Sequence, residues 1–201
     1  MLTLTTIATG STGNSYALNY NGKILLLECG VSYSKIKQGI DFKTSSVVGC
    51  LISHSHKDHC KSLSEIIGSG IKTYASHENI QESGVIPNHF LRTVHPGEQF
   101  EIGEFQIKAI PVNHDVPNMS YLIRAGEETI YFVTDTNYIP YNIPGLKHLI
   151  IEANYSEKIL NQNFQNNQIE AVRVKRLYNS HYSIEKLIDY VKKCPSLQTV
   201  I

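Results

Sequence analysis

Three histidines and one aspartate lie within six residues of the stretch Ser53-His54-Ser55-His56-Lys57-Asp58-His59-Cys60. The apolar run at residues 47–52 predicts a buried strand just before it, and a helical pattern follows from about Lys61 to Ile67. A strand end, a loop and a helix start direct several side chains toward one point. Imidazole nitrogens and carboxylate oxygens suit zinc, and also iron or manganese, so the stretch predicts a metal site.

The spacing of these side chains suggests two adjacent metals. His54 and His56 alternate along an extended segment, which places both rings on the same side. Asp58 and His59 follow where the chain turns and can face a second point, as needed for ions about 3.5–4 Å apart. A lone histidine in a polar loop is usually only solvated, but four potential ligands this close together favour a metal role.

The string H-x-H-x-D-H resembles the metal motif of the metallo-β-lactamase-fold hydrolase superfamily. The chain looks most similar to the branch that contains ribonuclease Z and related DNA exonucleases, which have a short Ser/Gly/Asn loop near the N-terminus. This resemblance implies an α/β (αββα) fold of two stacked mixed β-sheets flanked by helices. Residues 1–201 would form a single domain.

The resemblance also implies two ligands further along the chain. His114 ends a predicted strand at residues 105–110, and Asp135 follows another at residues 129–133, where the family places a carboxylate that bridges both metals. A turn or helix cap is the alternative for Asp135, and a turn is the simpler interpretation of Asp115. The implied first site is His54, His56, His114 and Asp135, and the implied second site is Asp58, His59 and Asp135.

His181 lies between two predicted helices, at residues 170–177 and 183–193. The resemblance implies that it approaches the scissile phosphate as a transition-state stabiliser or proton donor, and that Asp58 is also catalytic. The alternative is a histidine that merely precedes a helix capped by Ser183. Arg176 is a candidate for holding phosphate, although a solvated basic helix end explains it equally well.

Four further segments carry predictions. Asn14 and Ser15, in the N-terminal Ser/Gly/Asn loop, are candidates for hydrogen bonds to a phosphate or to the ligand loop, although a plain turn is the alternative. Glu28 stands where the family often has an Asp that supports the ligand loop from behind. Residues 152–154, Glu-Ala-Asn, resemble a family motif for which we expect a structural role, and residues 161–168, rich in Asn and Gln, predict a polar loop with a helix start.

The family has a further histidine after the strand predicted at residues 197–201, and this sequence has none there. We therefore expect a C-terminally truncated domain, lacking a strand, loop and helix, that binds one metal tightly and the other weakly. Substitution by His181 is the alternative, but His181 precedes a helix rather than following a strand.

Composition constrains the partners. Lys plus Arg equal Asp plus Glu, at 18 each, so no global charge attracts nucleic acid, although a local basic patch remains possible. The four cysteines lack C-x-x-C spacing and favour reduced thiols in a cytoplasmic protein. No signal peptide and no span near 20 apolar residues is visible, so no membrane association is expected. Oligomeric state is not indicated.

These features together predict a metal-dependent hydrolase, preferably a nuclease that cleaves phosphodiester bonds with a metal-activated hydroxide. One or two Zn²⁺ ions are expected, with Mn²⁺ or Fe as alternatives. A small-molecule ester, thioester or lactone hydrolase of the same fold is a second interpretation. An inactive member that binds nucleic acid or a partner is a third, and a redox di-iron protein has the least support.

Overall fold

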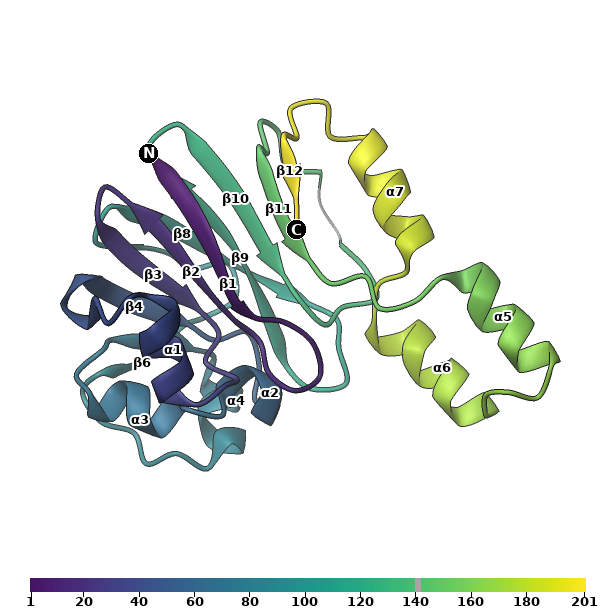
Figure 1. The fold of residues 1–201 in the computed structure, drawn as a ribbon, viewed down its shortest axis with the longest axis horizontal. Helices are drawn as coiled ribbons and strands as arrows, with labels where there is room; N and C mark the ends of the chain where they lie inside the picture. The colour runs from purple at the N-terminus through teal and green to yellow at the C-terminus, as the bar shows by residue number, and fades with distance from the viewer. Residues whose placement is uncertain (140–141) are drawn as a thin grey trace.

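Two six-stranded β-sheets stack face to face in the computed structural model, which describes residues 1–139 and 142–201 (Figure 1). Both sheets are mixed, with helices on their outer faces. The α/β sandwich predicted from the sequence is therefore confirmed.

The first sheet has the order β1-β2-β3-β4-β5-β6, antiparallel from β1 to β3 and parallel from β3 to β6. Its strands are β1 (Leu2–Ala8), β2 (Ser15–Tyr20), β3 (Lys23–Leu27), β4 (Val47–Leu51), β5 (Thr73–Ala75) and β6 (Leu91–Thr93). The helices of this half are α1 (Tyr33–Gly39), α2 (Lys57–Cys60), α3 (Leu63–Gly68) and α4 (His77–Ser83), with a 3-10 turn at Thr44–Ser46.

The second sheet has the order β12-β11-β10-β9-β8-β7, antiparallel from β7 to β10 and parallel from β10 to β12. Its strands are β7 (Gln99–Ile102), β8 (Phe105–Val112), β9 (Asn118–Ala125), β10 (Glu128–Val133), β11 (His148–Ile151) and β12 (Thr199–Val200). Its helices are α5 (Glu157–Gln165), α6 (Ala171–Ser180) and α7 (Ile184–Lys192). Among the described residues, no helix has the length and apolar character needed to cross a bilayer.

Alternation along the strands builds separate apolar layers. Leu25 and Leu27 of β3 face the second sheet and pack in the same cluster as Phe105, whereas Leu26 points outward to the layer that contains Ile36 of α1. Each such fully buried side chain stabilises the fold by roughly 1.5–3 kcal/mol. A third cluster joins the outer face of the second sheet to α7, while α5 and α6 project beyond the sandwich (Figure 1).

One local prediction is wrong. The Asn- and Gln-rich segment predicted as a polar loop lies largely in α5, which begins earlier and ends at Gln165. The Ser156 hydroxyl accepts a hydrogen bond from the Ile159 backbone N–H and caps the helix. This cap and the buried Leu160 outweigh the weak helix propensity of the polar residues.

The N-terminal loop packs directly against the backbone of α2. The Asn14 backbone N–H donates to Asp58 O at 2.7 Å, and the Cys29 backbone N–H donates to His59 O at 2.8 Å. Gly30 lies so close to this turn that an added Cβ would overlap the carbonyl of Asp58. The absence of a side chain at position 30 therefore permits the contact between the two loops.

We expect Gly30→Ala to lower the free energy of unfolding by about 3 kcal/mol, because the added methyl group meets backbone rather than a movable side chain. Urea unfolding followed by circular dichroism measures the change. Gly68→Ala is the matched control, since Gly68 ends α3 with open space around it and alanine is the better helix former. Equal stability of the two variants would contradict the close packing of these loops.

Candidate active site

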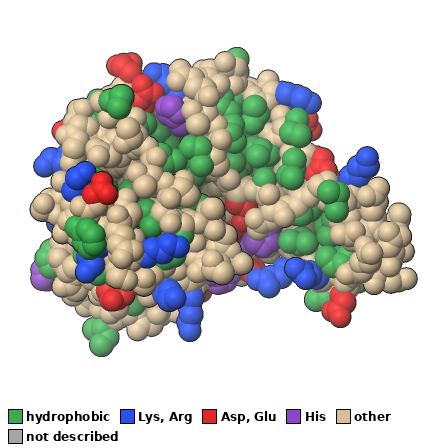
Figure 2. Space-filling view, viewed as in Figure 1, with side chains coloured by type: hydrophobic (Ala, Val, Ile, Leu, Met, Phe, Trp, Pro, Cys, Tyr) green, Lys and Arg blue, Asp and Glu red, His purple; other side chains and the backbone are tan. Residues whose placement is uncertain are grey.

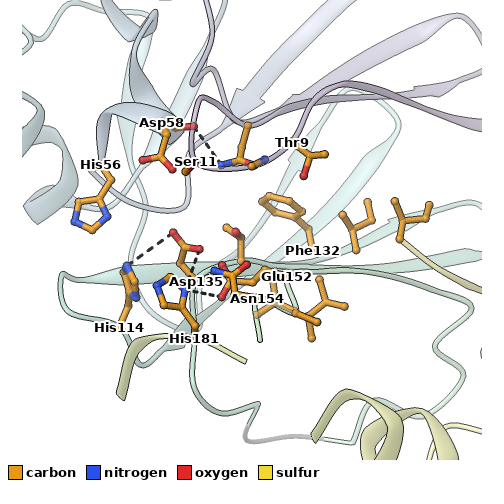
Figure 3. Close-up of a pocket in the computed structure, with 18 of the residues that line it drawn as sticks. Thr9, Ser11, His56, Asp58, His114, Phe132, Asp135, Glu152, Asn154 and His181 are labelled. Carbon is orange, nitrogen blue, oxygen red and sulfur yellow. Dashed lines mark hydrogen bonds and ion pairs between the residues drawn. The ribbon is translucent and has the colours of Figure 1, made fainter. Parts of the chain in front are cut away.

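The ends of four strands bring the candidate ligands to one edge of the sandwich. Residues 54–59 follow β4, His114 follows β8, Asp135 follows β10 and Glu152 follows β11. Figure 3 shows His56 and Asp58 on one side of the resulting cavity, with His114, Asp135 and Glu152 on the other. Residues separated by about 80 positions in the sequence therefore face one another.

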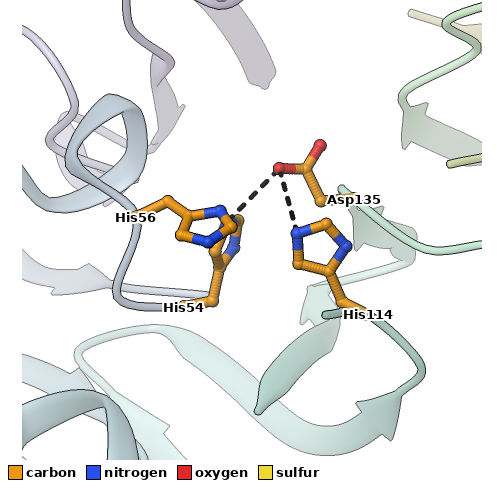
Figure 4. Close-up of side chains that lie close together, drawn as sticks. All are labelled: His54, His56, His114 and Asp135. Carbon is orange, nitrogen blue, oxygen red and sulfur yellow. Dashed lines mark hydrogen bonds and ion pairs between the residues drawn. The ribbon is translucent and has the colours of Figure 1, made fainter. Parts of the chain in front are cut away.

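The first group consists of His54, His56, His114 and Asp135 (Figure 4). One donor atom from each residue lies within 4.8 Å of every other. Asp135 Oδ2 is 3.3 Å from His54 Nε2 and 3.8 Å from His114 Nε2. This is the set that the sequence predicts for a first metal, and three imidazoles with one carboxylate match the donors that zinc prefers.

The orientation of the rings suits a cation at the centre of this group. His114 Nδ1 lies 3.0 Å from the Ser180 carbonyl oxygen, and His54 Nδ1 lies 2.9 Å from the Ser53 hydroxyl. A ring that donates its Nδ1–H outward presents the Nε2 lone pair inward. His114 Nε2 is buried and makes no hydrogen bond among the described residues, as expected of a ligand atom, and the Asp115 carboxylate lies 2.8 Å from it.

The second group consists of Asp58, His59 and Asp135. His59 Nε2 lies 3.1 Å from Asp135 Oδ2 and 3.4 Å from Asp58 Oδ2. Asp135 thus belongs to both groups, and its backbone φ of 48° is in the left-handed region that non-glycine residues rarely adopt. Strain of this kind is concentrated at functional sites.

Two buried polar residues hold the second group from behind. The Glu28 carboxylate accepts the Ser53 backbone N–H at 3.2 Å and lies 3.7 Å from His59 Nδ1. The Asn14 side-chain nitrogen lies 3.2 Å from His59 Nε2. Glu28 is fully buried, with a positive φ of 66°, so it acts as a support rather than as a contact for substrate.

The protonation states of the histidines in the first group favour metal binding. Burial, followed by the charge of His54, lowers the pKa of His114 to about 4, and burial lowers the pKa of His54 as well. Neutral imidazole is the form that binds a metal. Burial also opposes charge on His59 and Asp135, yet the surrounding carboxylates raise the pKa of His59 and the surrounding imidazoles lower that of Asp135. A cation would take the place of the His59 proton.

A third group, Asp135, Glu152 and His181, was only partly anticipated. His181 Nδ1 lies 2.7 Å from Glu152 Oε1 and 3.8 Å from Asp135 Oδ1. Burial raises the pKa of Glu152 to about 8, and the adjacent Asp135 carboxylate adds to the rise. From the sequence alone we expect Glu152 to have a structural role. Its position directly after a strand, like that of Asp135, is the signal that marks it.

The other predicted site residues differ in whether they reach the cavity. Ser15 is fully buried and its hydroxyl donates to the Glu28 carbonyl oxygen at 3.1 Å, so the burial argues against the predicted contact with substrate. Asn14 lines the cavity, and its side-chain amide donates to the Asp58 carbonyl oxygen. This is the predicted contact with the loop at residues 54–59 rather than with a phosphate. Arg176 lines the cavity, and Asp115, interpreted as a turn residue, lies 2.8 Å from His114 Nε2.

The cavity has a volume of about 710 Å³. Its walls include Thr9 and Ser11 of the N-terminal loop, Phe132 of β10, and Arg173 and Arg176 of α6. Volumes of 300–1,000 Å³ are typical of ligand sites.

Comparison with known proteins agrees with this geometry. Residues 27–195 match the Beta-lactamase superfamily domain. The chain belongs to this family. Membership implies divalent-metal binding, and the described residues include groups of His, Asp and Glu side chains that could hold an ion.

Relatives place the chain in the predicted branch. It is 27% identical over 169 residues to exodeoxyribonuclease WalJ of Streptococcus pneumoniae, covering 77% of this chain and 63% of that protein. It is 26% identical over 118 residues to ribonuclease Z of Methanopyrus kandleri, covering 53% of this chain and 42% of that protein. The chain thus spans about 63% of the length of the exonuclease relative.

A solved structure supports the fold. The metallo-beta-lactamase fold protein YhfI from Bacillus subtilis superimposes with a TM-score of 0.72 at 18% identity, covering 98% of this chain and 86% of that one. At this identity the likeness concerns the fold alone.

We expect Asp135→Ala to reduce bound zinc by at least about tenfold, because both groups lose a shared ligand. Zinc per chain, measured by plasma mass spectrometry after dialysis, reports the loss. Asp189→Ala is the control, since Asp189 is exposed and pairs only with Lys192 among the described residues. Equal zinc in the two variants would exclude the assignment of Asp135.

We also expect the two groups to differ in affinity, because the first offers four donors and the second three. Dialysis against a weak chelator should leave about one ion per chain, followed by gradual loss against a strong chelator. Two ions retained equally tightly would contradict this difference.

Proposed function

We propose that this chain binds one or two divalent cations, preferentially Zn²⁺, and hydrolyses phosphodiester bonds of nucleic acid. The observation that carries the proposal is a carboxylate, Asp135, shared by two potential cation groups in a cavity that also holds His181 and Arg176. The imidazole-rich donor set favours zinc, and Mn²⁺ or Fe remain alternatives.

The names of the relatives support this substrate class. An exodeoxyribonuclease and a ribonuclease Z both act on nucleic acid, and they match 77% and 53% of this chain. We further propose that residues 1–201 act as one domain. The free, buried thiols of the four cysteines favour the predicted cytoplasmic location.

Divalent cations bound at these groups would lower the pKa of water and neutralise charge that develops on phosphate. The residues of the chain supply orientation and proton transfer. Asp58, with its side chain 31% exposed beside His59, faces the cavity and is placed to orient a water molecule. Arg176 would contact phosphate on the opposite wall.

His181 is suited to donate a proton to the leaving oxygen. Burial opposes its charge, but the hydrogen bond to Glu152 outweighs burial and raises the pKa of His181, so that this pair retains a proton between its two side chains. Glu152 and the Asn154 amide, 2.9 Å from Nδ1, occupy one side of the ring and leave Nε2 for substrate. A protonated imidazole held in this way is an effective general acid.

We expect His181→Ala to reduce kcat on single-stranded DNA by about 10²–10⁴-fold while bound zinc is unchanged, because the general acid is lost but the first group is intact. We expect Asp58→Ala to reduce both activity and occupancy of the second group. Steady-state cleavage with added zinc or manganese measures the activity. His89→Ala is the control, an exposed histidine outside the cavity.

Each outcome has a separate meaning. Full metal-dependent cleavage by Asp58→Ala would overturn the metal assignment. Full activity of His181→Ala would remove only the role of His181. Hydrolysis of thioesters or lactones, without cleavage of DNA or RNA, would favour the small-molecule alternative. Activity at background with every substrate would favour a binding protein without turnover.

A further inference from the structure

Helix α6 presents two arginines, Arg173 and Arg176, to the cavity. Residues three apart in a helix share a face, with Cβ atoms about 5–6 Å from each other. These two are the only Lys or Arg among the described residues that line the cavity. The three acidic lining residues all belong to the candidate cation groups, and both basic side chains of the cavity wall lie on this helix.

Neither guanidinium is held firmly by the protein. Arg176 lies 3.6 Å from Asp115 Oδ2, and its side chain is 66% exposed. Arg173 is exposed and has no ion-pair partner within 4.0 Å among the described residues. An exposed pair of this length is weak, whereas guanidinium binds phosphate through two parallel hydrogen bonds. Both arginines are therefore available to an anionic ligand.

The same helix is tied to the candidate metal site at its C-terminal end. The Ser180 carbonyl oxygen accepts a hydrogen bond from His114 Nδ1 at 3.0 Å, and His181 follows immediately. Along α6 from this end, Arg176 comes about one turn away and Arg173 about two. The arginines thus lie at increasing distances from the reacting groups.

The N-terminal loop gives the cavity uncharged polar side chains. Thr9 and Ser11 line it with hydroxyl groups and lie across from Glu152 and Asn154 (Figure 3). Figure 2 shows Lys and Arg side chains, in blue, beside a recess in which acidic and histidine side chains are visible. Charge contacts with a ligand therefore come from one side, along the helix.

We infer that α6 is a track for successive phosphates: the candidate cation groups hold the scissile phosphodiester, while Arg176 and then Arg173 hold the phosphates that follow it. This inference rests on the proposed function and narrows its substrate to a chain with several adjacent phosphates. A substrate with a single phosphodiester, or an uncharged ester, would offer neither arginine a phosphate to bind. With a net charge of zero, the chain has no overall attraction for a polyanion, and this pair adds local positive charge beside the candidate cation groups.

The cavity volume favours a single strand. A volume of about 710 Å³ lies in the range of small-ligand sites, which suits a few nucleotides of one strand rather than a stretch of duplex. A flexible strand can also place consecutive phosphates along one helix face, because each internucleotide linkage carries one charge.

The test uses oligothymidylates with one, two and four phosphodiester groups, so that the bond cleaved is the same and only the number of neighbouring phosphates changes. We expect kcat/KM of the wild-type chain to rise by about 10–100-fold from the shortest to the longest substrate. In the double variant Arg173→Gln/Arg176→Gln most of this rise should disappear. Zinc content and the urea midpoint of each variant establish that the site and the fold are retained.

Lys175→Gln is the matched control. It removes one positive charge from the same helix, but Lys175 does not line the cavity, so the length dependence should be kept. The salt dependence gives a second readout that a structural role would not change. The slope of log kcat/KM against log salt concentration should be shallower by about 1.4 in the double variant, at about 0.7 for each phosphate contact on a single strand.

Failure of this inference differs from failure of the proposed function. If no oligothymidylate is cleaved by the wild-type chain, the nuclease proposal itself is overturned. If cleavage occurs but kcat/KM does not depend on length, or if Lys175→Gln loses as much as the double variant, only the phosphate track is overturned.

Discussion

The Asp135 carboxylate, crowded by imidazoles at the edge of the sandwich, is the interaction on which the site depends. Its Oδ2 atom lies within 3.8 Å of Nε2 of His54 and His59, which follow β4, and of His114, which follows β8. Burial strengthens the electrostatic interactions within this cluster and raises the free-energy cost of an unpaired charge. A cation would satisfy the inward-facing lone pairs, which the fold holds close together.

Holding these side chains requires a second layer of buried polar contacts. Glu28 fixes the loop before the histidines through the Ser53 backbone, Asn14 binds α2, and the end of α6 orients His114. Such partners decide which nitrogen of each ring faces the metal. They also explain why Ser15 is buried: it supports Glu28 instead of lining the cavity.

Charge is distributed within the cavity in a way that suits a polyanionic substrate. The acidic side chains are gathered where cations would neutralise them, and the arginines lie beside them on α6. The overall balance of 18 basic and 18 acidic residues conceals this local separation. The proposed function therefore depends on placement rather than on composition.

Features that depend on neighbouring residues could be predicted without the fold. The H-x-H-x-D-H spacing and the strands before His114 and Asp135 are local patterns. Alternation alone predicts which strand residues face the core.

Three features became visible only in the folded chain: Glu152 contacts His181, the Ser15 hydroxyl donates to the Glu28 carbonyl, and Arg173 joins Arg176 on the cavity wall. These contacts join residues from separate strands and helices. Their distances follow from strand order and from the stacking of the two sheets, and spacing along the chain does not encode either.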